Sequence, residues 1–140
     1  MADSRKRILV VDDDLPALNA LKANLSQRGY DVETARSGEL AIELIDQDSY
    51  DLFILDVNMP GVNGLEVCKH IRQNPKTRDL PVIFLTAKGM VGDMMDGKEA
   101  GSDLYLVKPV LSAKILNMVS IFLSTDQPLA KKPKGGGSAA

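Results

Sequence analysis

Short runs of hydrophobic, mostly branched residues recur along the chain and predict β-strands. Three of them, Ile8–Val11, Leu52–Leu55 and Val82–Leu85, contain no polar residue, which is typical of strands buried on both faces of a sheet. The alternating run Asp31–Ala35 predicts an edge strand, and Leu104–Val107 predicts a short last strand. The pattern therefore predicts five strands.

Between these runs, hydrophobic residues recur three or four positions apart, which predicts amphipathic helices. The first helix is expected to begin after Asp14, a candidate N-cap, and to end at Gly29. A marginal helix is expected at about Met90–Ala100, where glycines interrupt the pattern. The apolar stripes of the four clearer helices are Leu18, Leu21 and Leu25; Leu40, Ala41, Leu44 and Ile45; Val67, Cys68 and Ile71; and Ile115, Met118, Val119 and Phe122.

Strict alternation of strands and helices predicts an α/β fold, in which a parallel five-stranded sheet is covered by helices on both faces. This is a three-layer, doubly wound (βα)5 domain, expected over residues 7–124. Residues 1–6 form an N-terminal extension. Residues 125–140, rich in lysine and glycine, are expected to form a flexible basic tail or linker.

Composition narrows the classes of function. The chain has 17 Lys and Arg against 19 Asp and Glu, a formal charge of -2, so no electrostatic attraction to nucleic acid is expected. One cysteine and one histidine exclude a disulfide framework and a Cys/His zinc cluster. No apolar stretch approaches the ~20 residues of a membrane span, and no signal peptide is visible. We therefore expect a cytoplasmic protein with no membrane insertion.

Polar residues that could take part in catalysis or metal binding stand where the predicted strands end. Asp12 and Asp13 follow the first strand, Asp56 the third, Thr86 the fourth and Lys108 the fifth. In doubly wound sheets, ligands bind outside the carboxyl ends of the strands, where the strand order reverses. If the order is 2-1-3-4-5, the three aspartates meet in one crevice.

Carboxylates that lie this close repel one another unless a hard cation neutralises them, and Mg2+ is the natural candidate. Lys108 and Thr86 supply an ammonium and a hydroxyl that would bind the oxygens of a transferred phosphoryl group. Asp56 is then the candidate nucleophile and phosphoacceptor. Asp14, which stands before Leu15 and Pro16, is instead interpreted as a helix cap.

Four motifs at these strand ends resemble those of the response-regulator receiver domain of two-component signalling. They are Ile8-Leu-Val-Val-Asp-Asp13, Leu55-Asp-Val-Asn-Met-Pro-Gly61, Leu85-Thr-Ala87 and Val107-Lys-Pro109. The resemblance covers about residues 6–124 and is specific because all four motifs occur in order. It implies a CheY-like, flavodoxin-like sheet with strand order 2-1-3-4-5.

The resemblance also assigns roles to individual residues. Asp56 would be the phosphoacceptor, and Thr86 and Lys108 would contact the phosphoryl group. Asp13, Asp56 and the Asn58 carbonyl would bind Mg2+ directly, and Asp12 would hold a metal-bound water. The peptide bond before Pro109 would be cis, and Thr86 and Tyr105 would form a switch. Asn58 and Lys88 would tune the lifetime of the phosphorylated state.

The implied function is a phosphorylation-activated signalling switch. A histidine kinase or a histidine phosphotransfer protein would supply the phosphoryl group, docking on about Leu15–Lys22 and Val110–Ser112. The face of the fourth helix, fifth strand and fifth helix would then change to regulate a downstream protein target. The chain is expected to be a stand-alone regulator, or a receiver excised from a longer protein, that catalyses only its own phosphorylation and dephosphorylation.

Two other functions stay open. One is an interaction module that works without phosphorylation. The other is an aspartate-nucleophile phosphatase, although such enzymes carry a second aspartate two residues after the nucleophile, where this chain has Asn58. His70 and Cys68 lie in the third helix pattern, and we interpret them as a surface histidine and a small core residue.

Overall fold

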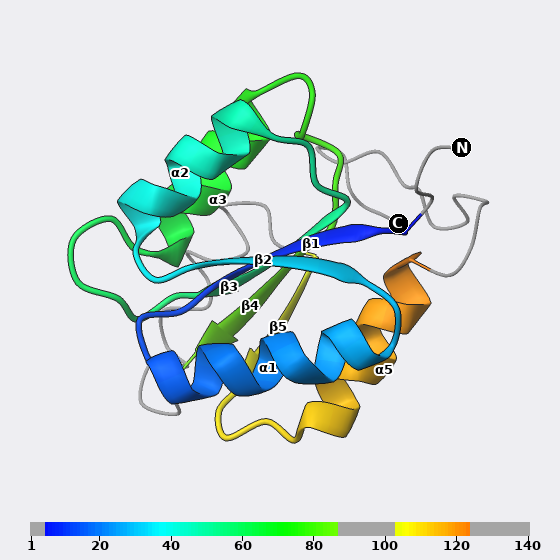
Figure 1. Cartoon of the computed structure of the whole chain (residues 1–140). Coiled ribbons are helices and arrows are strands. Elements are labelled where there is room, and N and C mark those ends of the chain that lie inside the picture. The colour runs from blue at the N-terminus through cyan, green and yellow to red at the C-terminus, as the bar shows by residue number, and fades with distance from the viewer. Residues whose placement is uncertain (1–4, 87–102, 124–140) are drawn as a thin grey trace.

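A computed structural model describes residues 5–86 and 103–123 of the 140-residue chain. The described part contains five strands and four helices, labelled as in Figure 1. The strands are β1 (Arg7–Val11), β2 (Asp31–Ala35), β3 (Leu52–Asp56), β4 (Val82–Thr86) and β5 (Leu104–Val107). The helices are α1 (Leu15–Gln27), α2 (Gly38–Gln47), α3 (Gly64–Gln73) and α5 (Ser112–Leu123).

The five strands form one parallel sheet in the order β2-β1-β3-β4-β5. β1 therefore pairs with β2 on one side and with β3 on the other, and the strand order reverses between β1 and β3. The predicted fold class and the strand order implied by the resemblance are both confirmed. The crevice at the reversal point is where this type of sheet binds its ligands.

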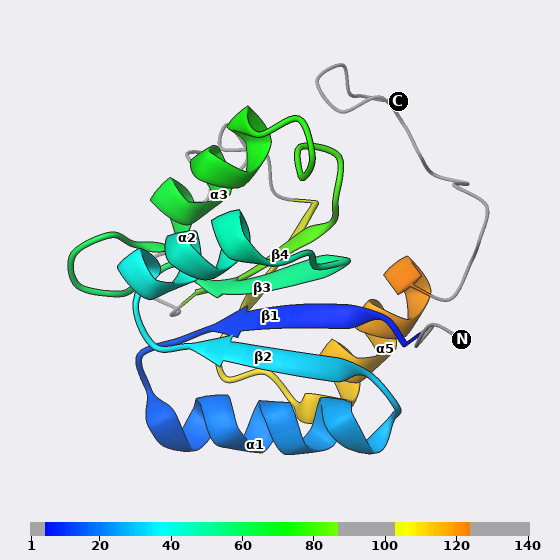
Figure 2. The same cartoon turned by 45° about the horizontal axis from the view of Figure 1, so that its top comes forward.

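Two hydrophobic layers cover the sheet, one on each face. Alternate residues of β1 point to opposite layers, so Leu9 and Val11 join one core cluster whereas Ile8 and Val10 join the other. The first cluster includes side chains of α2 and α3, and the second includes those of α1 and α5. Figures 1 and 2 show the same arrangement, with α2 and α3 on one side of the sheet and α1 and α5 on the other.

Local sequence fixes where three of the helices begin. Asp14 caps α1 by accepting from the Ala17 N–H at 3.5 Å, as predicted. The Ser37 hydroxyl caps α2 by accepting from the Leu40 N–H at 3.1 Å. α3 begins with a reciprocal capping box, because Asn63 and Glu66 each accept the other's backbone N–H at 3.1 Å.

Two expectations need correction. Asp56 and Thr86 are the last residues of β3 and β4 rather than the residues after them, because the ladder continues to the pairs Asp56–Leu85 and Thr86–Val107. Leu40, predicted in the apolar stripe of α2, is 38% exposed, whereas Ala41 and Ile45 carry that stripe into the core. The buried stripes of α1 and α3 are confirmed.

Several expectations concern residues outside the described part of the chain. These are the helix at about residues 90–100, the role of Lys88 and the tail at residues 125–140. They stay predictions.

Candidate functional site

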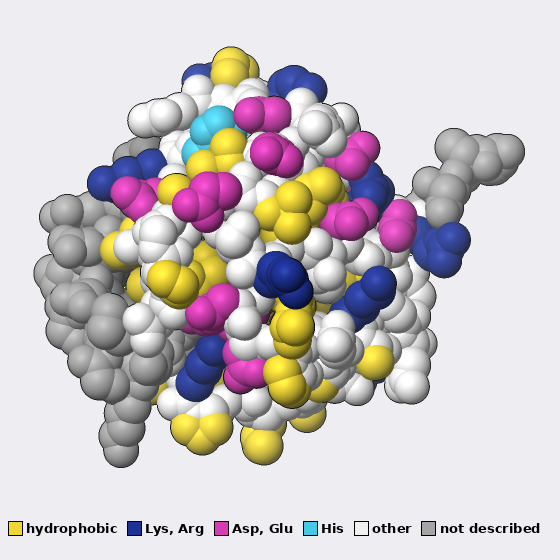
Figure 3. Space-filling view, turned by 60° about the vertical axis from the view of Figure 1, so that its left-hand side comes forward, with side chains coloured by type: hydrophobic (Ala, Val, Ile, Leu, Met, Phe, Trp, Pro, Cys, Tyr) yellow, Lys and Arg dark blue, Asp and Glu magenta, His cyan; other side chains and the backbone are white. Residues whose placement is uncertain are grey.

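Backbone hydrogen bonds continue the sheet beyond the strands and hold the strand-end residues side by side. The Asp12 N–H donates to the Ala35 carbonyl at 3.1 Å, and the Lys108 N–H donates to the Thr86 carbonyl at 2.7 Å. Asp12, Asp56, Thr86 and Lys108 therefore stand at one edge of the sheet, where the strands end. Figure 3 looks at the molecule from this side and shows acidic side chains interspersed with hydrophobic and a few basic ones.

Three carboxylates meet at this edge. One oxygen from each of Asp12, Asp13 and Asp56 lies within 4.8 Å of the others. Asp12 and Asp56 are each 3% exposed, whereas Asp13 is exposed. The Asp14 N–H fixes Asp12 by donating to its Oδ1 at 3.0 Å, while the Asp14 side chain caps α1. The structure thus brings together three of the four neighbouring acids and gives the fourth a structural task.

Lys108 is the cation of the site. Its Nζ lies 3.2 Å from Asp12 Oδ2 and 3.5 Å from Asp56 Oδ2. Burial lowers the pKa of Lys108, but the carboxylates of Asp56 and Asp12 outweigh that effect, so the net pKa is raised and the ammonium stays charged. The Lys108–Pro109 peptide bond is cis.

Asp56 is the acid of the site whose pKa is shifted most. Its pKa is raised from 3.8 to about 6, first because the carboxyl is buried and then because Asp12 hydrogen-bonds to it and repels its negative charge. The Asn58 N–H, which donates to Asp56 Oδ1 at 3.0 Å, and the ammonium of Lys108 act in the opposite direction. The carboxylate is therefore held in place but is short of positive charge.

The remaining predicted residues differ in how deeply they are buried. Thr86 is fully buried at the end of β4, and Asn58 is exposed two residues after Asp56. Tyr105 lies in β5, 37% exposed and in register with Phe84 of β4. Within the predicted docking ranges Leu15–Lys22 and Val110–Ser112, Leu18 is 3% exposed and belongs to the core, whereas Pro16 is exposed and Val110 half-buried.

The two residues interpreted as structural lie away from the site. Cys68 is fully buried, and burial raises the pKa of its thiol to about 11, so its assignment to the core is confirmed. His70 is partly exposed, but its Nε2 lies 2.8 Å from Asp46 Oδ1 and links α3 to α2. No local pattern in the sequence signals this pair, because its partners stand 24 positions apart.

Sequence reasoning also missed two glycines that shape the site. Gly38 and Gly64 are the first residues of α2 and α3, and both face the loop after Asp56 closely enough to leave no room for a Cβ atom. Glycine is not specially favoured at the first position of a helix. Its occurrence there was therefore the available sign that these two positions have little space.

The donor set fits a magnesium ion. All three side chains offer carboxylate oxygens, the ligands that Mg2+ prefers, and the exposed Asp13 keeps the cluster open to solvent. Among the described residues, three acids stand against the one ammonium of Lys108, which leaves an excess of negative charge, and repulsion by Asp12 adds to burial in raising the pKa of Asp56. A divalent cation would remove that excess.

No helix among the described residues is long and apolar enough to cross a membrane.

The sequence was compared with protein families and with individual relatives. The family described as response regulator receiver domain matches residues 8–120. The response regulator MprA of Mycolicibacterium vanbaalenii is 42% identical over 122 residues, which cover 87% of this chain and 52% of that protein. The chain therefore spans about half the length of this relative.

Solved structures show the same fold. A putative response regulator from Chloroflexus aurantiacus is 37% identical with a TM-score of 0.81, and the match covers 87% of this chain and 100% of that one. The response regulator TrrA from Thermotoga maritima, solved in complex with Mg2+ and BeF, is 39% identical with a TM-score of 0.74. That match covers 84% of this chain and 99% of TrrA.

Proposed function

Because the chain belongs to the response regulator receiver domain family, we propose that it is a switch controlled by transfer of a phosphoryl group to Asp56. The observation that carries this proposal is the cluster of Asp12, Asp13 and Asp56, with Lys108 as its only cation among the described residues. Such a site has acceptor, metal ligands and countercharge in one crevice.

The reaction is a substitution at phosphorus. A carboxylate oxygen of Asp56 attacks the phosphorus of a phosphohistidine or of a small acyl phosphate and forms a new P–O bond. The bond between phosphorus and the leaving group breaks, and the leaving group keeps the electron pair. Asp56 must be ionised to attack, so its raised pKa makes a nearby positive charge part of the reaction's requirements.

The side chains around Asp56 divide the remaining work. Lys108, which contacts Asp12 and Asp56 in this structure, would move its ammonium to a phosphoryl oxygen as negative charge arrives. The Thr86 hydroxyl, buried at the end of β4, would contact a second oxygen. Mg2+ held by Asp12, Asp13, Asp56 and the Asn58 carbonyl would supply the positive charge that offsets the phosphoryl oxygens.

Signalling requires that this local change reaches the surface. We assign that role to Thr86 and Tyr105. Thr86 is the last residue of β4, and Tyr105 lies in the neighbouring strand β5. A threonine drawn toward the phosphoryl group would free space for the half-exposed tyrosine to turn inward. Asn58 and Lys88 are assigned to tuning of the lifetime of the phosphorylated state.

Receiver domains signal through histidine kinases and downstream effectors, and the docking surface is part of the proposal. Leu15 at the start of α1 is 41% exposed, and Leu111 in the loop before α5 is 78% exposed. Both lie at the edge of the sheet that carries Asp56. They give a histidine-bearing partner an apolar contact beside the acceptor, together with Pro16 and Val110.

Intact mass spectrometry of the 140-residue chain tests this function. With Mg2+ and acetyl phosphate, we expect one labile phosphoryl adduct in the wild type and in Asp14→Asn, and none in Asp56→Asn. Asp14→Asn is the matched control because its carboxylate caps α1 beside the cluster without joining it. An adduct of undiminished intensity in Asp56→Asn would rule out Asp56 as the acceptor.

A further inference from the structure

The loop that follows the acceptor is held down by its own buried side chains. Val57 and Met59 are 4% and 7% exposed and belong to the core cluster beneath α2 and α3, against which the half-buried Val62 also packs. Between them, Asn58 is exposed and donates its N–H to Asp56 Oδ1. The position of Asn58 is therefore set by how the loop at residues 57–63 rests on its neighbours.

Helix α3 closes one end of this loop. A Cβ atom on Gly64 would lie 2.9 Å from the Asp56 carbonyl carbon and 3.0 Å from Val57 Cα, and the Asp56 carbonyl oxygen is nearer still. The first turn of α3 thus packs directly on the backbone of the acceptor residue.

Helix α2 closes the other end, although it carries none of the reacting groups. A Cβ atom on Gly38 would lie 2.7 Å from Val62 Cγ1 and 2.8 Å from the Val62 carbonyl carbon, with the carbonyl oxygen nearer still. The next residue, Glu39, places its carboxylate over Gly61, whose φ of +71° is a left-handed conformation. The first turn of α2 therefore contacts two consecutive residues of the loop, beside which it also lies in Figures 1 and 2.

We propose that the first turn of α2 is a positioning element of the phosphoacceptor site, because Gly38 lets the helix backbone press on Val62 and so fixes the loop that aims Asn58. The proposal rests on the proposed function in one respect, since Asn58 is taken there as a magnesium ligand. It assigns to Gly38 a role that reaches the site through Val62 and involves no contact with the reacting atoms.

For Gly38→Ala, the proposal predicts a disturbance of the site, whereas helix propensity alone predicts a more stable α2, because alanine stabilises a helix more than glycine does. In this structure the added methyl meets the Val62 backbone, which cannot turn aside as a flexible side chain would. The loop must shift, and Asn58 must shift with it.

The test compares three variants of the full chain with the wild type. Gly38→Ala should move the backbone amide NMR signals of residues 57–59 in the metal-free protein and weaken Mg2+ binding by about tenfold, the cost of disturbing groups that orient metal ligands. Leu40→Ala is the matched control, because Leu40 lies in the same helical turn and is 38% exposed. It should change neither readout.

Val62→Ala provides a second variant if Gly38→Ala does not fold. It removes the Cγ1 atom that faces Gly38, so the Asn58 amide should exchange with solvent faster and Mg2+ should bind more weakly. Wild-type amide signals and Mg2+ affinity in the folded Gly38→Ala protein, or in Val62→Ala, would overturn the proposal. So would equal changes in Leu40→Ala.

Failure of the proposed function gives a different result. In that case the wild type takes up no phosphoryl group, while the amide signals of residues 57–59 still report whether Gly38 positions the loop.

Discussion

At the edge where the strands begin, Arg72 and Asp103 form a pair 3.0 Å apart. At the edge where the strands end, Asp12 and Asp56 share the ammonium of Lys108, and Asp13 adds a third carboxylate to the cluster. Arg72 and Asp103 are 15% and 14% exposed, and Asp12 and Asp56 are each 3% exposed, whereas Asp13 is exposed. The same sheet therefore carries one balanced and one unbalanced set of charges.

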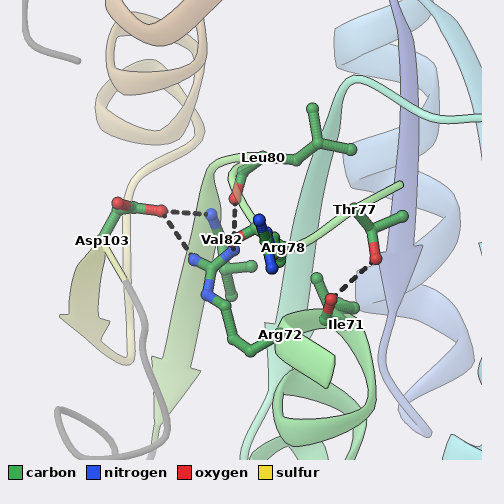
Figure 4. A network of polar contacts seen from close by, with 7 residues as sticks. All are labelled: Ile71, Arg72, Thr77, Arg78, Leu80, Val82 and Asp103. Atoms are coloured by element: carbon green, nitrogen blue, oxygen red, sulfur yellow. Dashed lines mark hydrogen bonds and ion pairs between the residues drawn. The ribbon is translucent and has the colours of Figure 1, made fainter. Parts of the chain in front are cut away.

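The network at the first edge satisfies its groups with backbone partners (Figure 4). Arg72 Nη1 donates to the carbonyls of Arg78 and Leu80 at 2.9 and 2.7 Å, and Asp103 Oδ2 accepts from the Val82 N–H at 2.9 Å. These bonds join the end of α3 to the starts of β4 and β5. At the other edge, the described residues leave an excess of negative charge, and the proposed function assigns its balance to a bound cation.

The largest effect is expected from breaking the balanced network. Arg72→Met leaves the Asp103 carboxylate buried without the guanidinium that faces it, which should lower the free energy of unfolding by about 3 kcal/mol. Urea unfolding of the variant and the wild type measures this loss of free energy of unfolding. Arg78→Met is the matched control, because Arg78 contributes its carbonyl to the network while its side chain is exposed. A loss below about 1 kcal/mol in Arg72→Met would show that the two edges do not differ in this way.

Adding Mg2+ should stabilise the unbalanced edge. A ligand that binds only the folded state at 100 times its Kd raises the free energy of unfolding by about 2.7 kcal/mol. We expect this gain in the wild type and in Asp14→Asn, and a strongly reduced gain when Asp12, Asp13 or Asp56 is changed to Asn. Thermal unfolding with and without Mg2+ measures it. Equal gains in all five proteins would place the ion elsewhere.

Removing one charge from the unbalanced edge should stabilise the metal-free protein. Between about pH 4 and pH 6 the folded state binds a proton at Asp56 that the unfolded state releases, because the folded pKa is raised from 3.8 to about 6. The stability contributed by this group is therefore lost as the pH rises through that window. At pH 7, Asp56→Asn should gain about 2 kcal/mol relative to the wild type, and the gain should vanish near pH 4.

Unfolding curves at several pH values, recorded in a chelating buffer, measure that difference. Asp51→Asn at the opposite edge should show no such gain, because the Asp51 carboxylate accepts the Arg7 N–H at 2.7 Å. A difference between Asp56→Asn and wild type that stays constant with pH would contradict the assignment of the excess charge to Asp56.

The smallest effect is expected for the exposed hydrogen bond between His70 and Asp46. His70 and Asp46 join α3 to α2 at 2.8 Å, but their side chains are 31% and 53% exposed. Because exposed pairs contribute little, His70→Gln should change the free energy of unfolding by less than about 0.5 kcal/mol. A loss comparable to that of Arg72→Met would mean that burial is not what separates these pairs.

Much of the fold was accessible from local patterns. The runs at residues 8–11, 52–55 and 82–85 are strands because branched hydrophobic residues pack well on a sheet covered on both faces. Asp14 could be assigned as a cap from its place before a helical pattern. Leu40 was misassigned because the periodicity that predicts a stripe does not say where the stripe's margin lies.

The candidate site was accessible for a related reason. Parallel strands all end at the same edge, so residues at strand ends are neighbours once the strand order is known, and Asp12, Asp56, Thr86 and Lys108 each stand at such an end. The order itself came from the motifs. Hydrophobic patterning is compatible with several orders, because each strand is buried on both faces in any central position.

Tertiary structure alone decided which charged and backbone groups are partners. Arg72 and Asp103 stand 31 positions apart, and Gly38 of α2 meets Val62 in the loop before α3, so no spacing in the sequence signals either contact. Periodicity records whether a residue faces the core, because burial repeats with the geometry of the helix or strand. A single long-range contact has no period. The sequence therefore determined the layers and placed the candidate site residues at the strand ends, whereas the packing of α2 on the loop and the closure of the opposite edge followed from the folded geometry.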